Sequence, residues 1–129
     1  MIVDTSAVIA ILFAESDAER YALAIAGSDH CRMSAANYVE TAIVVDAQTR
    51  AGAGREVDNF LRRAGIQIAP VTEEQAHLAR QAYAEFGKGR HRAGLNFGDC
   101  FAYALAKSSG ERLLFKGGDF ALTDVASAL

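Results

Sequence analysis

Four short apolar runs, separated by longer stretches with helical character, constrain the fold of this chain more than any other feature. The runs are Met1–Val3, Cys31–Ser34, Ile66–Ala69 and Arg112–Phe115. Short strands that alternate with helices form parallel sheets covered by helices, because each crossover lays its helix on a face of the sheet. We therefore predict an α/β protein with three layers, α/β/α, and a mainly parallel central sheet, in one domain of residues 1–129.

Capping residues and hydrophobic spacing locate the helices. Thr5 or Ser6 is expected to cap the first helix, and Thr72 with Gln75 forms a capping-box pattern. The predicted helices are Ser6–Phe13, Ser16–Ala26, Ala35–Arg50, Glu56–Ala64, Glu73–Phe86 and Asn96–Lys107. We predict loops at Ala51–Arg55 and Gly87–Gly94, and a short helix with an edge strand in the tail.

The charge balance limits how this chain could hold nucleic acid. Its formal net charge is −3 at pH 7, so binding by bulk positive charge is excluded, and a local metal ion or basic patch would have to neutralise phosphate. The one dense basic cluster contains Lys88, Arg90, His91 and Arg92. Phosphate contact and an ordinary solvated loop both stay open as explanations of this cluster.

The N-terminal segment and the cysteines indicate the compartment. The segment is short, is interrupted by Asp4 and has no preceding basic region, so we expect neither a signal peptide nor a membrane span. Cys31 and Cys100 lie in apolar contexts, where we expect buried thiols in preference to a disulfide. These features predict a cytoplasmic protein.

Four acidic residues stand where surface acids are unusual. Asp4 ends the first apolar run, and Glu40 lies in the largely apolar helix ANYVETAIVV. Asp99 lies in the apolar helix NFGDCFAYALA, and Asp119 follows LLFKGG. A buried carboxylate is costly unless it is paired or bound to a cation, and neighbouring carboxylates raise each other's pKa. Asp4 and Asp119 also follow strands, at the edge where ligands gather in open α/β sheets.

A divalent cation would compensate such a group of carboxylates. Mg²⁺ and Mn²⁺ prefer hard oxygen ligands and keep several water molecules, so a carboxylate pocket can bind one and leave positions for water and phosphate. The bound ion lowers the pKa of its water and orients in-line attack on a phosphodiester. No spacing of Cys or His residues indicates zinc.

Each acid also has a purely structural explanation. Asp4 and Asp119 can cap the helices that follow them, and Asp99 can be stabilised by the dipole at the start of its helix. Glu40 lies in mid-helix, where it caps nothing, although it can face solvent. The four acids together indicate a site more strongly than any one of them alone.

The same four segments resemble the PIN-domain family of ribonucleases. MIVDTSAVIAIL is similar to the family's first strand, which ends in Asp before a small hydroxyl residue, and SAANYVETAIV is similar to the helix that carries its Glu. LNFGDCFAYALAK and LLFKGGDF are similar to the segments of its third and fourth acids and look like those of VapC toxins. The resemblance covers essentially the whole chain and implies the PIN-like fold.

Carried over to this chain, the resemblance implies one catalytic, metal-binding pocket for Mg²⁺ or Mn²⁺. Its members would be Asp4, Glu40, Asp99 and Asp119. Asp4 and Asp99 would be direct ligands, whereas Glu40 and Asp119 would act on the metal directly or through water. Thr5 or Ser6 would orient a carboxylate or a water molecule.

The chain departs from the family in its fourth segment. That segment often contains Gly-Asn-Asp, whereas Gly118 takes the middle position here and provides no polar side chain. Thr123 and Asp124 resemble the family's trailing Thr-Asp pair, and we expect Asp124 to support the pocket or to cap a helix.

The resemblance to VapC toxins implies an endoribonuclease toxin that hydrolyses RNA and inhibits translation, with a cognate VapB-type antitoxin and a homodimeric state. A PIN-domain RNA-processing nuclease without an antitoxin is the first alternative. A catalytically silent interaction module is the second, and the complete set of acids argues against it. A receiver-type or phosphoryl-transfer domain would need a second acid or a Thr/Lys set beside Asp4, which Asp4-Thr5-Ser6 does not offer.

Overall fold

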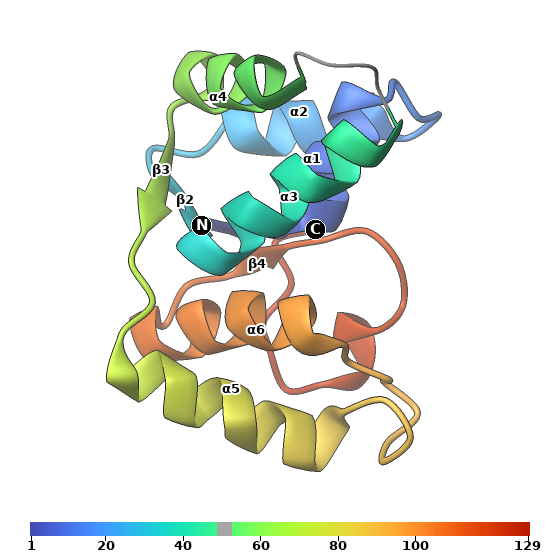
Figure 1. The fold of residues 1–129 in the computed structure, drawn as a ribbon, viewed down its shortest axis with the longest axis vertical. Helices are drawn as coiled ribbons and strands as arrows, with labels where there is room; N and C mark the ends of the chain where they lie inside the picture. The colour runs from blue at the N-terminus through green and yellow to red at the C-terminus, as the bar shows by residue number, and fades with distance from the viewer. Residues whose placement is uncertain (49–52) are drawn as a thin grey trace.

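The protein is a parallel sheet between two layers of helices (Figure 1). The computed structural model describes residues 1–48 and 53–129. The described strands are β1 (Ile2–Val3), β2 (Cys31–Ser34), β3 (Ile66–Ala69) and β4 (Leu113–Leu114). The described helices are α1 (Thr5–Leu12), α2 (Ala18–Ala26), α3 (Ala35–Gln48), α4 (Ala53–Ala64), α5 (Glu73–Phe86) and α6 (Phe97–Ser109), followed by the 3₁₀ turn η1 (Phe120–Leu122).

The sheet has the order β3-β2-β1-β4, and every neighbouring pair is parallel. Ile2 is in register with Arg32 on one side of β1 and with Leu113 on the other. The predicted parallel α/β architecture is therefore confirmed. The predicted edge strand in the tail is reduced to an isolated parallel bridge between Leu113 and Ser127.

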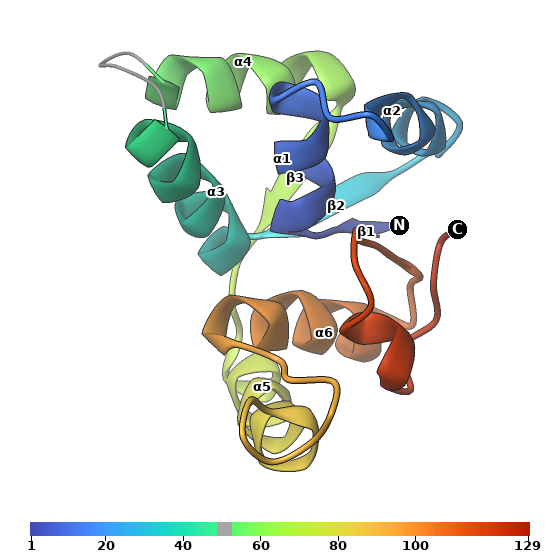
Figure 2. The ribbon, with the colours of Figure 1, turned by 90° about the vertical axis from the view of Figure 1, so that its right-hand side faces the viewer.

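Successive strand residues point to opposite faces and so supply two separate cores. Ile2 and Leu113 belong to the core shared with α5 and α6, whereas Val3 and Leu114 belong to the core shared with α1 to α4. All four side chains are fully buried. The edge-on view in Figure 2 shows the same division, with α1 to α4 on one face and α5 and α6 on the other.

Most predicted elements are present, with shifted ends. The predicted loop at Ala51–Arg55 is wrong where it is described, because α4 already begins at Ala53. Gly54 lies in the first turn of α4, and the buried side chains of Val57 and Leu61, four positions apart, anchor the helix to the core. The predicted end of α3 at Arg50 and positions 51–52 of the loop lie outside the described residues.

The first helix is capped by Asp4, as the structural explanation of that acid allowed, and not by Thr5 or Ser6. The Asp4 side chain accepts a hydrogen bond from the backbone N–H of Ser6 at 2.9 Å, so the prediction of a cap at Thr5 or Ser6 is wrong. Asp4 is placed at the carboxyl end of β1, immediately before α1. This edge of the sheet carries the candidate site.

Two further expectations concern the cysteines and a membrane span. Cys31 and Cys100 are both buried free thiols, as predicted. In residues 1–48 and 53–129, no helix has the length and apolar character needed to cross a membrane.

Candidate active site

Asp4 is a buried carboxylate with one satisfied oxygen and one unsatisfied oxygen. Its side chain follows β1 and is only 3% exposed. Oδ2 accepts hydrogen bonds from the Ser6 backbone N–H at 2.9 Å and from the Ser6 hydroxyl at 2.6 Å, whereas Oδ1 is buried and has no partner within residues 1–48 and 53–129. Burial raises the pKa of Asp4 to about 6, and the negative charge of Glu40 adds to this shift while the Ser6 hydrogen bonds oppose it.

Glu40 reaches from α3 toward the start of α1 and the start of α6. Its Oε2 accepts a hydrogen bond from Thr5 Oγ1 at 2.6 Å and another from Asn37 Nδ2 at 3.1 Å. Asn37 also donates to the backbone oxygen of Gly98 at 3.0 Å. Glu40 is therefore held inside a polar network and does not simply face solvent.

Asp99 lies in the first turn of α6 and takes part in its capping box. Asp99 Oδ2 accepts a hydrogen bond from the backbone N–H of Asn96 at 2.8 Å, and Asn96 Oδ1 accepts one from the backbone N–H of Asp99 at 2.9 Å. This arrangement fixes the carboxyl group at the end of α6 that faces the site, and occupies one of its two oxygens.

The pKa of Asp99 reports the proximity of the other acids. Burial is the largest cause of a pKa raised to about 7, and the Asn96 hydrogen bond opposes it. The remaining upward contributions are the charges of Asp4, Glu40 and Asp119. Asp4, Glu40 and Asp119 thus lie within electrostatic range of Asp99, although the four acids come from positions 4 to 119 of the chain.

Asp119 is the most loosely held of the four. It is exposed, it follows a turn in which Gly117 has a φ of 100°, and its side chain makes no capping hydrogen bond to η1. The structural alternative in which Asp119 caps the following turn through its side chain is therefore wrong. Gly118 is also exposed and leaves open space where a side chain would stand.

Asp124 belongs to a different network. Its Oδ1 accepts a hydrogen bond from the Tyr103 hydroxyl at 2.6 Å, and its Oδ2 pairs with Lys107 Nζ at 2.9 Å. These contacts attach the tail of the chain to the later turns of α6. The expectation that Asp124 caps a helix is not met, since both carboxylate oxygens bind side chains.

The oxygen atoms of the site suit a divalent cation. Among the described residues, no three His, Cys, Asp or Glu side chains form a ready-made metal-binding group. Mg²⁺ commonly binds through one or two carboxylates and retains water in its other positions, so a closed cage is not required. The unpartnered Asp4 Oδ1 and the mutually repelling carboxylates supply hard, negatively charged oxygen atoms, and the residues fit such an ion.

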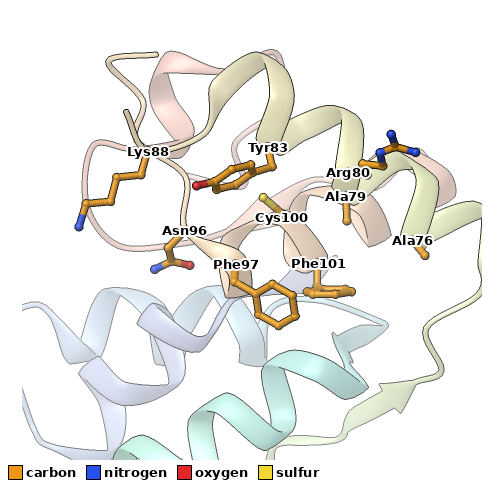
Figure 3. A pocket seen from close by; sticks show the side chains of 9 residues that line it. All are labelled: Ala76, Ala79, Arg80, Tyr83, Lys88, Asn96, Phe97, Cys100 and Phe101. Atoms are coloured by element: carbon orange, nitrogen blue, oxygen red, sulfur yellow. The ribbon is translucent and has the colours of Figure 1, made fainter. Parts of the chain in front are cut away.

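An apolar groove includes Asn96 and Cys100 of the segment around Asp99 in its lining. It has a volume of about 570 Å³ and lies between α5 and α6 (Figure 3). Tyr83, Phe97 and Phe101 line it, and Lys88 and Arg80 stand at its rim. The Arg90 guanidinium lies 5.9 Å from the centre of the Tyr83 ring, which places part of the basic cluster next to this groove.

Two residues of the site were not found from the sequence, namely Asn37 and Gly98. Asn37 is fully buried one helical turn before Glu40, and a polar residue at this spacing on an apolar helix was the only available signal. Gly98 precedes Asp99 and contacts Glu40. The two residues are 58 positions apart, so no local sequence pattern could predict this contact.

The sequence matches a protein family and related proteins along almost its whole length. Residues 1–126 match the PIN domain family. The chain is 54% identical to "Ribonuclease VapC30" of Mycobacterium tuberculosis over 128 residues, which are 98% of this chain and 97% of that one.

Two solved structures are similar in fold. The crystal structure of Mycobacterium tuberculosis VapC20, described as a "Sarcin-Ricin loop cleaving toxin", has a TM-score of 0.77 at 16% identity and covers 97% of this chain and 95% of that one. A "Toxin-antitoxin complex from Klebsiella pneumoniae" has a TM-score of 0.74 at 15% identity and covers 99% and 97% of the two chains.

Proposed function

Because this chain belongs to the PIN-domain family, within its VapC ribonucleases, we propose that it is an RNA-cleaving toxin whose four acids bind a divalent cation and hydrolyse phosphodiester bonds. Membership of the family supports the reaction class. The assignment of the site is carried by its geometry. The Asp4 carboxylate is buried and its Oδ1 has no partner among the described residues, and Asn37 joins Glu40 to the first turn of α6, where Asp99 lies. Structural roles alone give no reason to gather four carboxylates at one edge of the sheet.

Asp4 and Asp99 are the proposed direct ligands of Mg²⁺ or Mn²⁺. Each has one carboxylate oxygen fixed by hydrogen bonds, from Ser6 and from Asn96 respectively, which leaves the other oxygen to meet a cation. When bound, the ion lowers the pKa of a coordinated water and offsets negative charge on the phosphate.

The other polar residues of the site position these groups. Thr5 and Asn37 fix Glu40, so that its carboxylate enters the site in one orientation. Asp119 is exposed and free of a capping contact, and it acts on the ion directly or through water. The RNA backbone is held at the Lys88–Arg92 cluster, which offsets the repulsion between phosphates and a chain of net charge −3.

We further propose that the toxin is paired with a VapB-type antitoxin and forms a homodimer. The name of the VapC30 relative and the presence of a toxin–antitoxin complex among the similar folds support the antitoxin. Three large apolar side chains on neighbouring helices support the dimer, because Val39 and Ile43 of α3 and Phe97 of α6 are 52%, 62% and 77% exposed. A second copy that covers this surface would remove it from water.

The decisive experiment measures cleavage of end-labelled RNA by the purified chain. We expect cleavage with Mg²⁺ or Mn²⁺, none after chelation, and a loss of roughly 100-fold or more in Asp4→Asn and Asp99→Asn. Asp46→Asn is the matched control, since Asp46 is exposed on α3, and it should cleave like wild type. Cleavage that persists after chelation would contradict metal-assisted hydrolysis.

Expression experiments test the toxin and its partner. The wild-type chain alone should arrest bacterial growth and create new RNA ends, whereas Asp99→Asn should do neither. Co-expression of the neighbouring small reading frame should restore growth and yield a complex with the toxin. An active enzyme that leaves growth unaffected would instead indicate an RNA-processing nuclease without an antitoxin.

A further inference from the structure

The Glu40 carboxylate is held by contacts that come from residues other than the four acids. Within the described chain, its recorded hydrogen bonds both end on Oε2, one from Thr5 Oγ1 at 2.6 Å and one from Asn37 Nδ2 at 3.1 Å. Asn37 donates its second N–H to the backbone oxygen of Gly98 at 3.0 Å. One amide group therefore joins the acid of α3 to the first turn of α6, where Asp99 lies.

Gly98 makes this approach of α3 and α6 sterically feasible. A Cβ atom at position 98 would overlap Glu40 Oε1 and would lie 2.5 Å from both Cδ and Oε2 of the same side chain. The backbone of Gly98 is not in the left-handed region, so its conformation does not call for glycine. Glycine is needed because the Glu40 carboxylate rests on its α-carbon.

Asn37 shows the features of a dedicated hydrogen-bond donor. It is fully buried, and its Oδ1 has no partner in the described structure. An unsatisfied buried amide oxygen costs free energy, so stability alone does not favour an asparagine at this position. The benefit lies in its two N–H groups, which bind Glu40 and Gly98 at the same time.

We propose that Asn37 and Gly98 are positioning residues that hold the Glu40 carboxylate beside Asp99, so that the divalent cation meets carboxylates already in place. This inference rests on the proposed function and adds to it two residues outside the acidic set. Both residues act through Glu40. Loss of such supporting contacts around a metal site commonly reduces metal affinity or activity about 10- to 100-fold.

Gly98→Ala is the sharpest test, measured on the intact metal-free chain. We expect the Kd for Mn²⁺, from isothermal titration, to rise about tenfold and kcat for RNA cleavage to fall about 10- to 100-fold. KM for RNA should change by less than about twofold, because position 98 supports the acids and not the RNA-binding surface. The melting temperature should stay close to that of wild type, since the preference of alanine over glycine in a helix offsets the hydrogen bonds that a displaced Glu40 loses.

Gly54→Ala is the matched control. Gly54 also lies in the first turns of a helix, and a Cβ atom there would meet nothing within 4 Å. This variant should show the same helical benefit in melting temperature with wild-type Mn²⁺ affinity and cleavage. A loss of Mn²⁺ affinity in both glycine variants alike would overturn the assignment of a specific role to Gly98.

A double-mutant cycle with Glu40→Asp separates positioning from general damage. Glu40→Asp withdraws the carboxylate by one methylene, so an alanine at position 98 should then cost little further Mn²⁺ affinity. Additive losses in the double variant would overturn the proposal, because they would show that Gly98 acts independently of Glu40.

Asn37→Leu provides a second cycle that does not depend on the folding of Gly98→Ala. Leucine keeps the branching at Cγ but donates no hydrogen bond, so Mn²⁺ affinity should fall about tenfold in the wild-type background and much less with Glu40→Asp. Wild-type Mn²⁺ affinity in both Asn37→Leu and Gly98→Ala would refute the positioning role while leaving the ribonuclease intact. A wild-type chain that neither binds Mn²⁺ nor cleaves RNA would refute both the inference and the proposed function.

Discussion

The Ser6 hydroxyl accepts a hydrogen bond from the backbone N–H of Lys116 at 2.9 Å, although 110 positions separate the two residues. The same hydroxyl donates to Asp4 Oδ2 at 2.6 Å. Ser6 thus connects the buried carboxylate at the end of β1 to the segment that leads from β4 to Asp119. One small side chain couples the placement of two acids.

We predict that Ser6→Ala reduces RNA cleavage about 10- to 100-fold, because Asp4 loses its hydroxyl donor and the Lys116 N–H loses its acceptor. The free energy of unfolding should fall by about 1 kcal/mol for the lost hydrogen bonds. Ser28→Ala is the control, since the Ser28 hydroxyl donates to the backbone oxygen of His30 and, in the described part of the chain, has no hydrogen bond to an acid of the site. Cleavage at wild-type rate in Ser6→Ala would remove this coupling role.

The stability of the metal-free protein should fall as the pH rises from about 5 to 8. The pKa values of Asp4 and Asp99 are about 6 and 7 in the fold, above the ordinary value of 3.8. Carboxyls with raised pKa values stabilise the fold fully below about pH 4, and this contribution is lost as the pH rises through 6 to 7, since the folded state must then carry unfavourable charges. Chemical denaturation at a series of pH values measures this slope.

Asp99→Asn should remove the part of the pH dependence of stability that comes from Asp99. Asparagine resembles the protonated acid and can still accept the Asn96 hydrogen bond. At pH 8 the metal-free variant should be more stable than wild type by on the order of 1 kcal/mol, after allowance for solvent screening at a partly exposed group. The difference should vanish near pH 4. A variant less stable than wild type at pH 8 would contradict repulsion among the acids.

Removal of the basic cluster tests its role in RNA binding. Lys88→Ala, Arg90→Ala and Arg92→Ala together should raise KM for RNA and flatten its dependence on salt, because fewer phosphates are neutralised. The kcat should change little, since none of the three contacts an acid of the site within the described hydrogen bonds and ion pairs. Arg62→Ala with Arg63→Ala, on the surface of α4, is the control. An unchanged salt dependence would show that the cluster is a solvated loop.

Asp124→Asn should affect stability and leave cleavage intact. The variant weakens the ion pair with Lys107 and alters the hydrogen bond from Tyr103. The pair is partly exposed, so the expected loss is about 1 kcal/mol or less. A large fall in kcat with an unchanged melting curve would instead assign Asp124 to the active site.

The order of the secondary-structure elements could be predicted because it depends on local patterns. Apolar runs of four residues or fewer, capping residues and helical spacing located each strand and helix, with errors at the ends. At Ala53 the prediction failed, since two glycines in the segment Ala51–Arg55 indicated a loop, whereas burial of Val57 and Leu61 stabilises a helix that begins earlier. Tertiary packing outweighed local propensity there.

The candidate site could be predicted in part. The four acids are unusual among their immediate neighbours, so the sequence itself singled them out as candidates, and their catalytic role stays a prediction. Asn37 and Gly98 were missed because their importance comes from contacts with α6 and with Glu40, across 61 and 58 positions of the chain. In Asp4, Glu40 and Asp99 the hydrogen bonds made within the described residues all end on one carboxylate oxygen, and the linear pattern did not indicate this arrangement.

The sequence by itself determined the parallel α/β architecture and singled out the four acids that we propose as the site, since periodicity and the cost of burying charge are both local properties of the chain. Only the tertiary structure decided which donors bind each acid, how closely α3 approaches α6 and which carboxylate oxygens are left for a cation. These properties depend on distances of a few ångströms between segments far apart in the chain, and such distances are set when the two cores pack against the sheet.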